Sequence, residues 1–200
     1  RRAWQYLPGQ RRVKLAPNLA YDTPNPGTSG SGSYDDVYVF NGALDRYDWK
    51  LVGKREMIVP YNTYALTYIK DPKPLTTAGH LAPEFVRWEK HRVWVVEATL
   101  KGDARHIYAK RRFYLDEDSW VALASDQYDA RGQLFRGSYS FLTQSYDVAT
   151  PNTAPHVIYD LVGGTYNING VVGPYGGIKY IDPPSKAQWS PEALAGAGIR

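Results

Sequence analysis

The stretch HRVWVVEATLKGDARHIYAKRRFYLDEDSWVALASDQYDARGQLFR, residues 91–136, sets the fold class. Its first part alternates strictly, with every second side chain apolar, which is the period-two pattern of a β-strand: Trp94, Val96, Ala98 and Leu100. Three further segments, near residues 106–115, 119–129 and 134–142, have strand character, and short polar turns separate them. Because short turns connect antiparallel neighbours, the sequence predicts a four-stranded antiparallel meander from which the rest of the sheet grows.

One residue breaks the pattern in the second of these segments. Arg111 falls on the side that Ile107, Ala109, Phe113 and Leu115 make apolar. It belongs to the basic run Lys110–Arg112, which resembles the Arg11–Arg12 pair near the beginning of the sequence. Such runs favour either a polar strand face or contacts with lipid headgroups or with the acidic surface of a partner.

The first third of the sequence mixes strands with a long irregular segment. Residues 3–8 and 12–16 flank a Pro-Gly turn and predict a hairpin. Residues 17–33 are so rich in Pro, Gly, Ser and Asn that they predict a mobile loop. The spacing of apolar residues in 35–47 favours a short helix, and residues 47–59 predict a long strand with a bulge at Gly53.

Later segments complete the predicted sheet. Residues 61–70 predict the strand that follows the long one, and residues 86–88 predict the start of the first meander strand. Gly163 and Gly164 lie between two strand-like segments and predict a hairpin turn. Ser190 and Pro191 predict the cap and first position of a terminal helical turn.

Composition narrows the function classes. The 200 residues suit a single domain, 1–200, and no run of 18 apolar residues predicts a membrane span. The net charge is +4, but the basic residues alternate with 20 acidic ones, so nucleic-acid binding is not predicted. The absence of Cys excludes disulfides and thiolate metal sites.

The sequence begins in what resembles the middle of a strand, with Met57 as its only Met, so we expect preceding residues and any targeting segment to be missing.

No motif predicts catalysis, a metal or a cofactor. The four His residues are well separated, and no GxSxG elbow is present. The acidic run Asp116–Asp118 lacks the spacing of a calcium loop and predicts a solvated turn. Asp35 and Asp36 are adjacent carboxylates, for which a helix cap is a simpler expectation than acid–base chemistry.

What remains is an aromatic-rich sheet with few helices to cover it. We predict that one apolar face of this sheet contacts something other than its own strands, although plain core packing is the alternative for each residue. The candidates are an upstream segment, a partner, or an apolar ligand held by a curved sheet. The predicted ligand-binding residues of this face are Trp4, Tyr6, Trp49, Leu51, Met57, Trp94, Val96 and Leu100.

Several stretches resemble a known family. WQYLPGQRRVKLAPN (4–18), SYDDVYVFNGALDRYDWKLVGKREMIVPYN (33–62), the segment 91–134 and VIYDLVGGTYNING (157–170) closely resemble a family of Gram-negative envelope proteins of unknown function. That family is similar to the outer-membrane lipoprotein-sorting proteins of the LolA and LolB type. The shared pattern includes the run from Trp4 to Val13, the acidic segment Tyr34–Asp36, and Phe113, Tyr114, Asp116 and Trp120.

The resemblance implies a fold and a role. It implies a mainly β (α+β) protein, built on a curved, unclosed antiparallel half-barrel with few short helices, and this chain matches the carboxy-terminal half of the family. It also implies a periplasmic carrier for lipid or another hydrophobic ligand, serving a transporter of the resistance-nodulation-division (RND) class. A structural adaptor that docks on an envelope transporter is the alternative, and a lipid-directed hydrolase is a third hypothesis.

Overall fold

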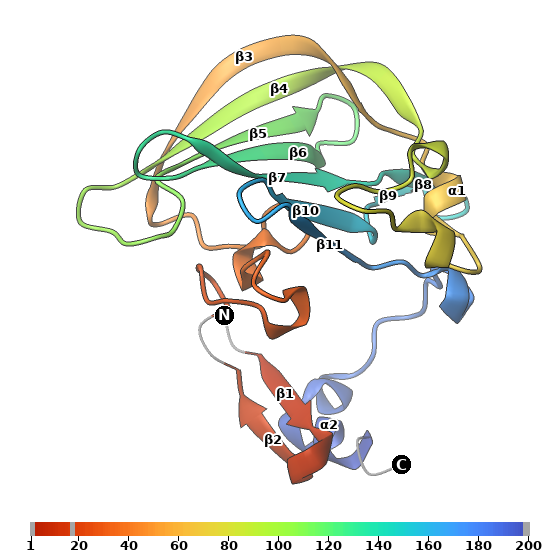
Figure 1. Ribbon diagram of the computed structural model, residues 1–200. Helices are drawn as coiled ribbons and strands as arrows, with labels where there is room; N and C mark the ends of the chain where they lie inside the picture. Colours follow the sequence, from red (N-terminus) through yellow and green to blue (C-terminus); the bar gives the residue numbers. More distant parts are fainter. Residues whose placement is uncertain (1–2, 17–18, 198–200) are drawn as a thin grey trace.

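The computed structural model describes residues 3–16 and 19–197, and its centre is a seven-stranded antiparallel sheet (Figure 1). The strand order is β11-β10-β7-β6-β5-β4-β3. In chain order these strands are β3 Tyr47–Pro60, β4 Trp88–Leu100, β5 Lys110–Asp116, β6 Ala122–Tyr128, β7 Leu134–Ser140, β10 His156–Asp160 and β11 Thr165–Asn169. The meander predicted from residues 91–136 is therefore confirmed as β4 to β7.

The side chains of the long strand β3 switch from one face of the sheet to the other at a bulge. Its pairing with β4 shifts between Leu51 and Gly53, so the predicted bulge is confirmed. Trp49 pairs with Ala98, whereas Met57, beyond the bulge, pairs with His91. One extra residue reverses the side to which all later side chains point, because strand side chains alternate with period two.

The sheet has two faces that differ in character. Paired positions on the inner face, as we call it, are Val95, Tyr114, Ala124, Tyr139 and Val157, from β4, β5, β6, β7 and β10. The outer face carries their neighbours in sequence, Val96, Phe113, Ser125, Ser138 and Ile158.

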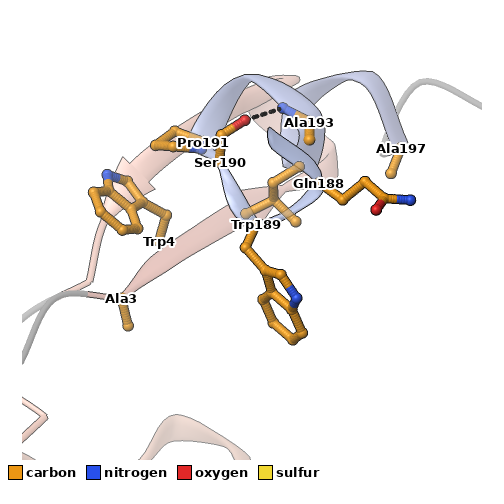
Figure 2. Close-up of a pocket in the computed structure, with 9 residues that line it drawn as sticks. Ala3, Trp4, Gln188, Trp189, Ser190, Pro191, Ala193 and Ala197 are labelled. Atoms are coloured by element: carbon orange, nitrogen blue, oxygen red, sulfur yellow. Dashed lines mark hydrogen bonds between the residues drawn. The ribbon is translucent and has the colours of Figure 1, made fainter. Parts of the chain in front are cut away.

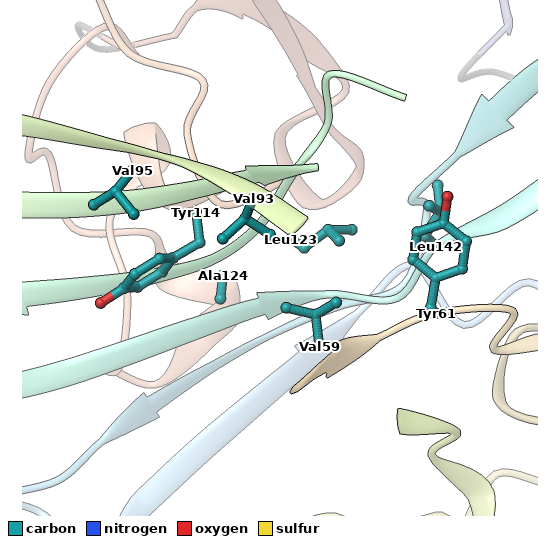
Figure 3. Packing of buried hydrophobic residues seen from close by; sticks show 8 residues of the cluster. All are labelled: Val59, Tyr61, Val93, Val95, Tyr114, Leu123, Ala124 and Leu142. Atoms are coloured by element: carbon teal, nitrogen blue, oxygen red, sulfur yellow. The ribbon is translucent and has the colours of Figure 1, made fainter. Parts of the chain in front are cut away.

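The sheet curves toward the inner face. Val59, near the end of β3, is fully buried in one cluster with Leu123 and Ala124 of β6 (Figure 3). In the sheet, β4 and β5 separate β3 from β6. Strands β3 and β6 therefore contact each other only because β3 folds back over the inner face. The expected fold, a curved antiparallel sheet that does not close into a barrel, is confirmed.

Smaller elements lie around this sheet. The predicted hairpin is confirmed as β1 Trp4–Leu7 and β2 Arg12–Leu15, which form a sheet of their own and contact the terminal helix α2 Pro191–Ala197. In Figure 1 this unit lies apart from the large sheet. Ser190 caps α2 as predicted, and its Oγ accepts a hydrogen bond from the backbone N–H of Ala193 at 3.1 Å. Strands β8 Thr143–Ser145 and β9 Thr150–Asn152 form a second small hairpin.

Two sequence predictions of secondary structure are wrong. Residues 61–70 form no strand; they contain the short helix α1 Tyr64–Thr67, whose Leu66 is fully buried against the sheet cluster that includes Phe141. Residues 35–47 form no helix beyond the single 3-10 turn η3 Tyr34–Asp36. Tyr38 and Val39 have φ values of 55° and 70°, a left-handed conformation that stops any right-handed helix.

Short 3-10 turns make up the remaining helical structure of the described residues; four of them lie between strands, and the last two along the chain lie between β11 and α2. They are η1 Pro8–Gln10, η2 Pro26–Thr28, η4 Lys73–Leu75, η5 Pro83–Phe85, η6 Gly173–Tyr175 and η7 Lys186–Trp189. None of the helices in residues 3–16 and 19–197 has the length and apolar character needed to cross a bilayer.

The segment predicted as a mobile loop has a defined path from residue 19 onward, while residues 17–18 lie outside the described part. Pro24 bridges to Ser33, and the Asn25 side chain accepts a hydrogen bond from the N–H of Gly27 at 3.0 Å. Thr28, Ser31 and Ser33 are buried. Mobility of the segment stays a prediction.

The bulge in β3 depends on a backbone conformation that favours glycine. Gly53 has a φ of 145°, and an added Cβ would meet no atom within 4 Å, so a substitution acts through the backbone alone. We expect Gly53→Ala to lower the free energy of unfolding by about 1 to 3 kcal/mol in urea titrations. Gly102→Ala is the matched control, because Gly102 also has open space around it and lacks a positive φ. If both substitutions lowered the free energy of unfolding equally, the bulge would not depend on the backbone conformation of Gly53.

Candidate functional site

A groove of about 370 Å³ lies on the inner face, between residues 80–88 and strands β7 and β10. Its walls are mostly aliphatic and aromatic, with one His at the rim. The lining residues are His80, Leu81, Pro83, Val86, Trp88, Tyr139, Phe141 and Tyr159. A pocket of about 300 to 1,000 Å³ with apolar and aromatic walls is typical of sites for small hydrophobic ligands.

Strand alternation explains how β7 supplies the floor of the groove. In the run Ser138–Phe141 the two aromatic residues point to the inner face and the two serines to the outer face. Tyr139 forms edge contacts with Trp88, at 5.5 Å between ring centroids, and with Tyr159, at 6.3 Å. Trp88 keeps 45% of its surface exposed, so an apolar molecule in the groove would cover it.

Tyrosine hydroxyls fix the opposite wall. The Tyr166 hydroxyl accepts a hydrogen bond from the Thr77 N–H at 3.0 Å and donates one to the Thr77 carbonyl at 2.8 Å. The Tyr159 hydroxyl accepts one from the Leu81 N–H at 3.4 Å. Burial raises the pKa of both Tyr139 and Tyr159. The phenols that line the groove are therefore neutral, which suits an uncharged ligand segment.

A second apolar pocket, of about 540 Å³, lies between the β1–β2 hairpin and α2 (Figure 2). It is lined by Trp4 from β1 and by Trp189, Pro191 and Leu194 from the C-terminal segment, among others. Trp189 is 75% exposed, so this pocket is open to solvent.

The outer face buries a group of charges rather than a ligand cavity. The Arg111 side chain is fully buried, and its guanidinium donates to Asp35 at 2.7 Å, to Asp36 at 3.0 Å and to the Val39 carbonyl at 3.1 Å. The earlier alternatives for the run Lys110–Arg112, a polar strand face, lipid headgroups or an external acidic partner, are therefore wrong for Arg111. Its acidic partners belong to the same chain, 75 and 76 residues away.

Neighbouring groups complete this ionic cluster. His106 Nε2 lies 2.9 Å from Asp35 Oδ2, and the Tyr108 hydroxyl donates to Asp36 at 2.7 Å. Burial by itself would raise the pKa of Asp35, but the hydrogen bond with His106 and the charge of Arg111 lower it to about 2. Asp35 is thus a buried anion at neutral pH, and it is not suited to proton transfer there.

The structure divides the eight predicted ligand-binding residues among three places. Five lie on the outer face of the sheet: Trp49, Leu51, Trp94, Val96 and Leu100. Met57 points to the inner face because of the bulge in β3, and Trp4 and Tyr6 belong to the separate hairpin. The prediction of one shared face is therefore wrong; whether each residue contacts a ligand stays a prediction.

Part of the outer-face group packs against the chain itself. Trp49 stacks on Phe113 at 5.8 Å and contacts the edge of Phe40 at 5.5 Å, and Phe40 follows the Asp35–Asp36 pair in sequence. Leu51 remains 61% exposed. Trp49 therefore packs partly against its own chain, in line with the core-packing alternative, and its contact with a ligand stays a prediction.

Sequence reasoning missed the residues of the groove. The alternation of Ser with Tyr139 and Phe141 was a readable signal for one apolar strand face. The contribution of residues 80–88 carried no such signal, because it depends on how the connection between α1 and β4 folds back onto β7 and β10.

A family model and a curated relative both match the whole chain or nearly all of it. A family model described as "Protein of unknown function (DUF1329)" matches residues 1–195. "Uncharacterized protein PA3922" of Pseudomonas aeruginosa is 43% identical over 205 aligned residues, which cover 100% of this chain and 44% of that protein. The chain thus spans about half the length of this curated relative.

Two solved structures are similar. One is described as a putative outer membrane lipoprotein-sorting protein domain from Vibrio parahaemolyticus, with a TM-score of 0.60, 16% identity, and coverage of 97% of this chain and 66% of that one. The other is a DUF1329 family protein from Desulfovibrio piger ATCC 29098, with a TM-score of 0.54, 16% identity, and coverage of 96% and 64%. At this identity the likeness concerns the fold alone, and the family model confirms the family resemblance stated from the sequence.

The ionic cluster predicts unequal effects for two adjacent arginines. Arg111→Met leaves two buried carboxylates without their counter-ion, which typically costs about 3 to 5 kcal/mol. Arg112 instead pairs with the partly exposed Glu97, so Arg112→Met should cost about 1 kcal/mol or less. Urea unfolding of both variants measures the difference, and equally small losses would show that the buried pair does not stabilise the fold.

Proposed function

We propose that this chain, which belongs to the DUF1329 family, is part of a periplasmic carrier that holds lipid or another hydrophobic molecule in the groove on the inner face of its sheet. The observation that carries the proposal is the groove itself, with its exposed Trp88 and its neutral aromatic walls. Covering such a surface stabilises a bound ligand by about 25 cal/mol per Å² before entropic costs are subtracted.

The surroundings of the groove also favour binding over catalysis. Its polar groups are tyrosine hydroxyls and His80, whose Nδ1 lies 2.9 Å from the Leu81 carbonyl and 3.1 Å from the Thr77 hydroxyl. The anionic Asp35 and Asp36 contact the outer face instead. We infer a role in holding and transferring a ligand, without covalent chemistry.

The location and the partner follow from the family resemblance. The similarity to a structure described as a lipoprotein-sorting domain supports a place in the bacterial envelope, and we propose the periplasm. Service to a transporter of the RND class remains part of this proposal. Because the chain covers 44% of its Pseudomonas relative, the full-length protein is the form to test.

Binding can be assigned to a pocket with three tryptophan variants of the full-length protein. The measurement is the affinity for a fluorescent fatty acid. We expect Trp88→Ala to weaken binding about tenfold, because removing a large aromatic contact costs about 1 to 2 kcal/mol. Trp189→Ala changes the second pocket, and Trp120→Ala changes a 66% exposed residue that lines neither pocket. Both should bind as the unmodified protein does.

The three variants separate the competing explanations. Loss of affinity in Trp189→Ala alone would move the ligand to the second pocket and overturn the assignment to the groove. A full-length protein that binds none of a series of fatty acids and phospholipids would contradict the carrier role itself and favour the adaptor alternative.

A further inference from the structure

A group of three potential metal ligands lies where β4, β5 and the β5–β6 turn meet. His91 belongs to β4, Asp116 is the last residue of β5, and Asp118 lies in the turn. One ligand atom from each side chain falls within 4.8 Å of the other two. The acidic run lacks the spacing of a calcium loop, and the solvated turn predicted from the sequence is wrong for Asp116, which is buried. His91 lies 25 residues before Asp116 in the sequence.

The two carboxylate oxygens of Asp116 differ in their hydrogen bonds. Its Oδ2 accepts hydrogen bonds from the Ser119 N–H at 2.8 Å, from the Ser119 hydroxyl at 2.6 Å and from the Tyr61 hydroxyl at 3.3 Å. Its Oδ1 is buried and has no hydrogen-bond partner within the described residues, although the residue is 0% exposed. A buried carboxylate oxygen without a partner is costly.

His91 is oriented as a metal-binding imidazole usually is. Its Nε2 lies 3.2 Å from Glu89 Oε2, and its ring stacks on Tyr61 with 3.7 Å between the centroids. When Nε2 carries the proton and donates it to Glu89, the lone pair of Nδ1 is left facing Asp116 Oδ1, 3.9 Å away. A carboxylate that fixes the histidine tautomer in this way is common behind metal-bound histidines.

The nearby positive charges are engaged by a different carboxylate. Glu117 accepts from Lys54 at 2.7 Å and from Arg92 at 2.6 Å. Within residues 3–16 and 19–197, neither Asp116 nor Asp118 forms an ion pair with a Lys or an Arg. The two carboxylates and the imidazole therefore leave net negative charge at this corner of the sheet.

We propose that His91, Asp116 and Asp118 bind one divalent transition-metal ion of the zinc class, which holds the β5–β6 turn against the start of β4. One imidazole nitrogen with two carboxylate oxygens is a common donor set for such an ion. Atoms that bind one ion at about 2.1 Å lie about 3 to 4 Å from each other, close to the separation of Nδ1 and Oδ1. Asp118 is exposed, so the ion can enter from solvent. The site does not rest on the proposed carrier function.

Calorimetric titration with Zn²⁺ tests the site directly. The full-length protein, freed of metal with a chelator, should bind Zn²⁺ at this site, and the ion should raise the Tm. Asp118→Asn and His91→Gln should each weaken this binding at least tenfold and abolish the rise in Tm. Asp118 is exposed and its carboxylate has no other described partner, so Asp118→Asn should fold normally even if a change at the buried Asp116 did not.

Two controls distinguish this site from general surface binding. Asp103→Asn and His80→Gln remove an exposed carboxylate and an exposed imidazole elsewhere, and both should leave affinity and Tm shift unchanged. The proposal is overturned if Zn²⁺ binds without saturation, or if it binds Asp118→Asn and His91→Gln as tightly as the unmodified protein.

Discussion

The buried pairing of Arg111 with Asp35 and Asp36 is the interaction on which the arrangement of this protein depends. It attaches the irregular segment before β3 to the middle of the large sheet, with no exposed surface on the Arg111 side chain. The same guanidinium holds the carbonyl of Val39, a β-branched residue with a left-handed backbone that needs such support. The part of the outer face around Arg111 is thereby covered by the chain itself.

On the inner face, parts of the chain fold over the sheet at its two ends. The bulge at Gly53 turns the end of β3 toward this face, and the strand closes over β6 at one end of the sheet. At the other end, the hydroxyls of Tyr159 and Tyr166 hold the connection before β4 across β10 and β11. The groove lies between the connection before β4 and the aromatic residues of β7 and β10. Its apolar character comes from both walls, because Leu81, Pro83 and Val86 face Tyr139 and Phe141 across it.

The sequence predicted the sheet better than the site. Strand alternation and short turns are local signals, and they were sufficient for the meander, the bulge and the hairpins. The prediction of a helix after Asp35 is wrong because the carboxylates of Asp35 and Asp36 bind Arg111, a partner that local spacing cannot reveal. The prediction that Met57 shares a face with Trp49 is wrong because the single extra residue at the bulge in β3 reverses the alternation of side chains. The groove combines β7 with residues 80–88, and the metal ligands span 28 residues; both depend on tertiary contacts.

The central claim is that an apolar ligand lies in the groove on the inner face, while the irregular segment before β3 packs against part of the outer face. Photo-crosslinking the full-length protein with a diazirine fatty acid, followed by mass spectrometry of the peptides, tests it most directly. The account predicts adducts on Val86, Trp88, Tyr139 and Tyr159. Adducts confined to Trp49, Trp94 and Val96, with none in the groove, would contradict it.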